Sequence, residues 1–134
     1  MARLVPSAAL LAGLLAAGCG GPTMIQAKGR VFKGGAPLLP GPDEAVRVMF
    51  VPIPEGGERV TDFHMAAYNR EDGTFRAAGK DGRGVPPGKY RIAVEYLRNR
   101  NDVLKGAFDA ERSPFTCVVN GREGELVLDL DKPH

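Results

Sequence analysis

The strongest structural pattern in this chain is the alternation in Tyr90-Arg91-Ile92-Ala93-Val94-Glu95-Tyr96. Every second residue from Tyr90 onward is aromatic or apolar, whereas Arg91 and Glu95 occupy two of the positions between them. Because successive side chains of a β-strand point to opposite faces, this spacing predicts a half-buried strand. We therefore expect Tyr90 and Tyr96 to bury their rings and to reach the rim of the core with their hydroxyl groups.

Working outward, the residues 46–51 and 125–130 show the same alternation, and weaker strand patterns cover 25–32, 60–68, 74–77 and 115–120. Turn sequences rich in Gly, Pro, Asn and Asp separate these segments, at 33–37, 54–57, 71–73, 84–88 and 120–121. Pro87-Gly88 is typical of a type II turn that leads into the strand at Tyr90. Many short strands with turns between them predict an all-β fold, a seven-stranded antiparallel β-sandwich.

The segment 99–112 departs from the strand pattern, because its apolar residues Val103, Leu104, Ala107 and Phe108 recur at helical spacing. We expect at most one short helix, around 102–108, although Gly106 disfavours it. The same loop holds the candidate binding residues Arg100, Asp102 and Lys105. Loops at the ends of a sandwich often carry recognition, so this one could contact a protein or a glycan. The alternative is that it only covers one end of the core with its apolar side chains.

Four strings, in this order, resemble the carboxypeptidase regulatory-like or transthyretin-like modules of small bacterial lipoproteins: Gly29-Arg30-Val31-Phe32-Lys33-Gly34-Gly35-Ala36-Pro37, Val48-Met49-Phe50-Val51-Pro52, Asp72-Gly73-Thr74-Phe75 and Gly84-Val85-Pro86-Pro87-Gly88-Lys89-Tyr90-Arg91-Ile92. The resemblance implies a prealbumin-like strand topology. It implies no activity, because a fold of this kind serves many roles.

The first eighteen residues have the pattern of an export signal, with a basic start, an apolar run and small residues before a cysteine. The end of this run resembles the lipobox of bacterial lipoproteins, in which Cys19 would receive the lipid. We expect a signal peptide at 1–18, a lipidated Cys19 and flexible tether at 19–24, and one β-sandwich domain at 25–132. The alternative is an ordinary secretory signal without lipid. Several acyl chains on Cys19 would anchor the protein firmly in a membrane.

Composition excludes several classes of function. Lys and Arg number 18 against 16 Asp and Glu, and the two signs are interspersed, so a nucleic-acid-binding surface is not expected. Cys117 alternates in phase with Phe115 and Val119, which predicts a buried, inert thiol. We expect His64 to be exposed on a strand face with Asp62. Neither histidine, His64 or His134, lies in a metal-ligand motif, so we expect no metal and no cofactor.

These observations favour a non-catalytic module with a structural or partner-binding role. It would be exported and lipid-anchored to the cell membrane or outer membrane, facing the periplasm or the exterior. Its partners would be the membrane, through lipid on Cys19, and an envelope protein or glycan. Two alternatives stay open: a hydrolase with a cryptic site on a transthyretin-like scaffold, and a carbohydrate-associated binding module. The chain has no tryptophan to stack against sugars, which counts against the second alternative.

Overall fold

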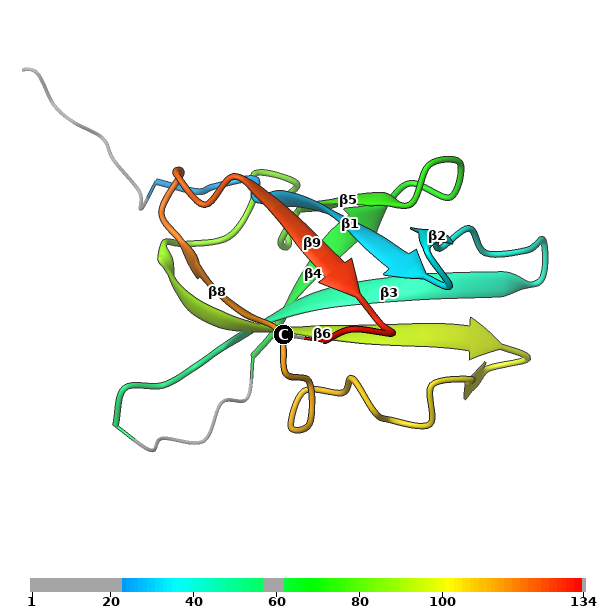
Figure 1. Ribbon diagram of the computed structural model, residues 1–134. Helices are drawn as coiled ribbons and strands as arrows, with labels where there is room; N and C mark the ends of the chain where they lie inside the picture. Colours follow the sequence, from blue (N-terminus) through cyan, green and yellow to red (C-terminus); the bar gives the residue numbers. More distant parts are fainter. Residues whose placement is uncertain (1–22, 57–61, 134) are drawn as a thin grey trace, which may run out of the picture.

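The computed structural model describes residues 23–56 and 62–133, and these residues form an all-β fold without helices (Figure 1). None of the described residues belongs to a helix that is long and apolar enough to span a membrane. Seven strands have four or more residues: β1 (Lys28–Lys33), β3 (Glu44–Pro52), β4 (His64–Tyr68), β5 (Thr74–Ala77), β6 (Gly88–Arg98), β8 (Thr116–Val119) and β9 (Glu125–Asp129). The two-residue strands β2 (Ala36–Pro37) and β7 (Asn101–Asp102) pair in antiparallel fashion with the ends of β1 and β6. The predicted all-β fold is confirmed.

The strands form one curled sheet in the order β9-β1-β5-β4-β3-β6-β8. β4 joins its two halves, because His64 and Met65 pair with β3 whereas the residues from Ala66 to Tyr68 pair with β5. All pairs are antiparallel except β1 with β9, which run parallel from Lys28↔Glu125 to Phe32↔Asp129. The prediction of a wholly antiparallel arrangement is therefore wrong for this one pair. The parallel pairing depends on the long route from β1 to β9, which local sequence does not reveal.

The two halves of the sheet, the upper and lower strands in Figure 1, enclose one hydrophobic core. The predicted alternation in β6 is confirmed, since Tyr90, Ile92, Val94 and Tyr96 are all buried. Phe50 of β3 lies at the centre, with its ring centroid 6.2 Å from that of Phe75 and 5.9 Å from that of Tyr90. Edge-to-face contacts of this kind add to the free energy that burial of the rings provides.

Turns follow the Gly-containing sequences, with one exception. Gly34 and Gly35 have φ values of 65° and 77°, and two consecutive positive φ values are typical of the type I′ turns that connect tight hairpins. Gly88, in contrast, has no positive φ and is the first residue of β6. The predicted type II turn at Pro87-Gly88 is therefore wrong, because the ladder between β6 and β8 already begins at Gly88.

The predicted short helix around 102–108 does not form, and the segment consists of β7 followed by turns. Lys105 and Gly106 have φ values of 55° and 77°, which lie outside the right-handed helical region. The prediction of a signal peptide at 1–18 and a lipidated Cys19 concerns residues outside those that the structure describes. The prediction of a strand at 60–68 is met from His64 onward by β4, but Asp62 and Phe63 are not part of a strand, and residues 60 and 61 also lie outside the described part.

Candidate functional site

The loop that carries the predicted binding residues is built around Asp102. Its Oδ1 accepts hydrogen bonds from the backbone N–H groups of Tyr96, at 3.1 Å, and Leu104, at 3.0 Å. Its Oδ2 accepts a third from the N–H of Gly106, at 3.0 Å. Three backbone donors around one carboxylate hold the turn in a single conformation. The structure therefore gives Asp102 a role in organising the loop.

The remaining residues of this loop divide into a covering part and an exposed part. Phe108 is buried and stacks on Phe115, with ring centroids 5.5 Å apart, and Leu104 packs against the core. The expectation that the loop covers the core is met by these side chains, but Val103 is 39% exposed and does not take part. Arg100 and Lys105 are exposed, and their role in partner binding stays a prediction.

His64 is half-buried rather than exposed, and its ring contacts Tyr90 edge-on with the centroids 6.1 Å apart. The prediction of an exposed histidine is wrong because position 64 faces the same side of β4 as Ala66 and Tyr68, which pack against the core. Asp62 is exposed. Within residues 23–56 and 62–133, no group of three or more His, Cys, Asp and Glu side chains could hold a metal ion.

Cys117 is a free, half-buried thiol on β8, between the buried residues Phe115 and Val119. Burial, together with the nearby charge of Glu123, raises the pKa of this thiol to about 11. Because the thiolate is the reactive form, a raised pKa makes the side chain a poor nucleophile. The prediction of a buried thiol is met only in part, because Cys117 is half-buried, although it does pack against the core.

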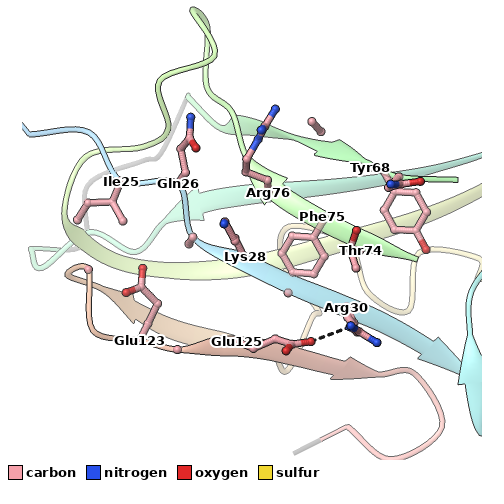
Figure 2. A pocket seen from close by; sticks show the side chains of 16 residues that line it. Ile25, Gln26, Lys28, Arg30, Tyr68, Thr74, Phe75, Arg76, Glu123 and Glu125 are labelled. Carbon is pink, nitrogen blue, oxygen red and sulfur yellow. Dashed lines mark ion pairs between the residues drawn. The ribbon is translucent and has the colours of Figure 1, made fainter. Parts of the chain in front are cut away.

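The described residues form an open groove of about 720 Å³ (Figure 2). It crosses the half of the sheet formed by β9, β1, β5 and the end of β4, and it includes residues before β1 and the turn before β9. Its lining residues are Ile25, Gln26, Ala27, Lys28, Gly29, Arg30, Ala67, Tyr68, Asn69, Thr74, Phe75, Arg76, Gly121, Glu123, Gly124 and Glu125. His64, Cys117 and the loop residue Asp102 do not line it. Among the residues that the structure describes, the groove is therefore separate from the side chains that the sequence singled out, namely Arg100, Asp102, Lys105, His64 and Cys117.

Strand register determines how the charges of the groove are arranged. Lys28 lies directly opposite Arg76 on β5 and opposite Glu125 on β9. The Glu125 carboxylate, however, forms its ion pair with Arg30, at 2.9 Å, drawn as the dashed line in Figure 2. On the other side of Arg76 the opposite residue of β4 is Ala67, which carries no charge. Lys28 and Arg76 thus occupy opposite positions on neighbouring strands. Neither side chain forms an ion pair with the residues that the structure describes.

Neutral polar groups and one further carboxylate surround these cations. The Gln26 amide donates to the Gly82 carbonyl at 2.9 Å, and the Asn69 side-chain oxygen accepts from the N–H of Glu71 at 2.9 Å. Each amide therefore has one polar atom engaged with the backbone and the other left over. The Oε1 atom of Glu123 is buried and receives no hydrogen bond from the described residues. The groove combines unpaired positive charge with several hydrogen-bonding groups.

Sequence reasoning missed the groove residues. The alternation of Lys28 and Arg30 with Gly29 and Val31 does predict that both cations face outward. Nothing in the local sequence indicates that β1 lies between β9 and β5, which is what brings Lys28 next to Arg76. Comparisons of the chain with protein-family models, with curated proteins and with solved structures find no match.

Proposed function

We propose that this chain is a non-catalytic, lipid-anchored module of the bacterial cell envelope that binds a partner through the groove over β1 and β5. In this proposal Cys19 carries the lipid, residues 19–24 form the tether, and residues 25–132 form a domain of the transthyretin-like or carboxypeptidase regulatory-like kind. The domain would face the periplasm or the exterior. The export-type pattern of residues 1–18 and the lipobox-like end of that segment support the anchoring.

The observation that carries the binding role is the facing pair Lys28 and Arg76 in the groove. Like charges directly opposite each other on neighbouring strands are destabilising. An arrangement that costs stability and has no packing purpose is typical of a binding site. The lining includes no histidine, cysteine or serine, and its charged side chains are of the kind that hold an ionic ligand. These features favour binding over catalysis.

The anchoring is tested by growing cells with labelled palmitate and comparing the full chain with its Cys19→Ser variant. We expect label in the wild-type protein, in the membrane fraction, and none in the variant. Equal labelling of both proteins, or labelling of neither, contradicts the anchoring.

The binding role is tested by cross-linking intact envelopes that contain one of two double variants. Lys28→Gln with Arg76→Gln removes two charges from the groove, and Arg100→Gln with Lys105→Gln removes two charges from the long loop. We expect the cross-linked product to be lost in the groove variant and kept in the loop variant. Loss in the loop variant alone would move the binding surface to the loop and contradict the proposal for the groove.

A further inference from the structure

The chemistry of the groove allows its ligand to be assigned to a class, an inference that rests on the binding role proposed above. Lys28 and Arg76 are exposed residues at a paired position of an antiparallel ladder, where opposite Cβ atoms lie about 4.5 to 5.5 Å apart. Figure 2 draws the two side chains on neighbouring strands within the same groove. Two long cationic side chains that start from such neighbouring positions on one sheet face can reach a single carboxylate or sulfate, and the planar guanidinium binds such groups in a bidentate manner.

The place of the groove on the sheet limits the kind of molecule that fits. β1 is paired on both sides, with β5 and β9, and β5 is paired with β1 and β4. The groove therefore lies on a sheet face, and its central strands β1 and β5 offer no free backbone edge on which a peptide could add as a further strand; only β9, at the end of the sheet, has one. A ligand in this groove binds mainly through side chains, so its own functional groups must supply most of the hydrogen bonds.

The uncharged groups of the groove match hydroxyl-rich ligands. The Gln26 amide uses its nitrogen, and the Asn69 amide its oxygen, in a hydrogen bond to the backbone. The oxygen of Gln26 and the nitrogen of Asn69 are therefore the atoms that can bind a ligand. The Glu123 carboxylate also lines the groove, and a carboxylate accepts hydrogen bonds from ligand hydroxyl groups. Alternating hydroxyl and acid groups are the chemistry of an acidic saccharide, and a groove of about 720 Å³ is within the range usual for ligand sites.

We propose that the groove binds an acidic oligosaccharide, with a carboxylate or sulfate between Lys28 and Arg76 and with hydroxyl groups on Gln26, Asn69 and Glu123. Arg30 is held by Glu125 and keeps that carboxylate away from the anion. Affinity comes from charge and hydrogen bonds and not from stacking, because the chain has no tryptophan and the two aromatic residues of the lining, Tyr68 and Phe75, pack against the core. Binding therefore weakens as the salt concentration rises.

The test is calorimetric titration of the detergent-solubilised full chain with a galacturonate hexamer, at low and at high salt. A neutral maltose-type hexamer and a glutamate hexapeptide are titrated in parallel. We expect binding of the galacturonate hexamer alone, weaker at high salt. Loss of a charge-assisted contact of about 1.5 kcal/mol corresponds to a roughly tenfold weaker affinity, so the variant Lys28→Gln with Arg76→Gln should bind at least about ten times more weakly.

The variant Arg100→Gln with Lys105→Gln, which loses the same charge elsewhere, should bind like the wild-type protein. Circular dichroism of both variants establishes that they are folded. Equal binding by the groove variant, or tighter binding of the peptide, overturns the saccharide assignment. If no saccharide binds but the groove variant still loses its cross-linked partner in envelopes, the ligand class is wrong and the proposed function stands. If the cross-link is unaffected as well, both fail.

Discussion

Replacing Asp102 tests whether this residue organises the long loop or serves to bind a partner. Its carboxylate accepts three backbone hydrogen bonds, two on Oδ1 and one on Oδ2. The side chain is only half-buried, so water can replace part of what is lost, and each bond contributes about 1 kcal/mol. Asp102→Ala should therefore lower the free energy of unfolding by about 3 kcal/mol.

The substitution Asp102→Asn separates the contributions of the two oxygens. An asparagine can keep the two bonds on Oδ1, but its amide nitrogen would face the N–H of Gly106, which is also a donor. We expect a loss of about 1 to 2 kcal/mol, between the wild-type protein and the alanine variant. With a shift of roughly 4 °C for each kcal/mol, the melting temperature should fall by about 12 °C for alanine and by about 4 to 8 °C for asparagine.

Thermal and urea unfolding followed by far-ultraviolet circular dichroism is the suitable assay, because the chain has no tryptophan for fluorescence. Lys105→Ala is the matched control, since Lys105 lies in the same turn with its side chain exposed, and it should change stability by less than about 0.5 kcal/mol. An alanine variant at position 102 that is as stable as the wild-type protein refutes the structural role. So does an asparagine variant that is no more stable than the alanine variant.

Three further predictions concern tyrosine, acid stability and a close backbone approach. Burial raises the pKa of Tyr68 from 10.0 to about 12. The folded protein therefore favours the neutral phenol, and the stability that this provides is complete below pH 10.0 and is lost as the pH rises toward 12. The pKa values of the other two tyrosines are also raised, mainly by burial, so the ultraviolet absorbance of tyrosinate should stay low at pH 10 and rise together with unfolding; a tyrosine that titrates normally in the folded protein contradicts this. Hydrogen bonds from a tyrosine hydroxyl, a backbone N–H and an arginine lower the pKa of Glu44 from 4.5 to about 2, so its contribution is present above pH 4.5 and is lost as the pH falls toward 2. The melting temperature of Glu44→Gln should accordingly depend less on pH in that interval, and identical acid profiles would count against the assignment. A Cβ at position 29 would overlap the carbonyl oxygen of Leu126 and the ring of Phe75, so Gly29→Ala should lower the free energy of unfolding in urea by about 1 to 3 kcal/mol. Gly56→Ala should be close to neutral, because no described atom lies within 4 Å of a Cβ at that position. Equal stability of the two variants refutes the close contact.

The strands that could be predicted are those whose residues alternate over their whole length. β3 and β6 have this pattern, and the inward side chains expected for them, such as Phe50 and Ile92, are buried. The prediction for 102–108 was wrong because helical spacing of apolar residues competed with stronger local effects. The Asp102 carboxylate takes backbone donors that a helix would use otherwise, and Gly106 adopts a positive φ.

The candidate site could not be predicted in the same way, because it depends on pairing between distant segments. Lys28 and Arg76 are 48 positions apart in the sequence, and each is an ordinary outward-facing residue of its strand. The same holds for His64, whose partial burial depends on Tyr90 packing against it from another strand. Arg100, Asp102 and Lys105 were chosen as candidate binding residues because they lie in one loop. Closeness along the chain does not identify residues that meet across strands.

The local sequence of this protein was sufficient for the all-β class, the main strands and their inward faces, because alternation of side chains is a property of each strand alone. The parallel pairing of β1 with β9, the division of β4 between the two halves of the sheet and the meeting of Lys28 with Arg76 required the folded chain. The physical reason is that register and strand order are selected by the burial of the whole core, which sums contributions from segments far apart in the sequence.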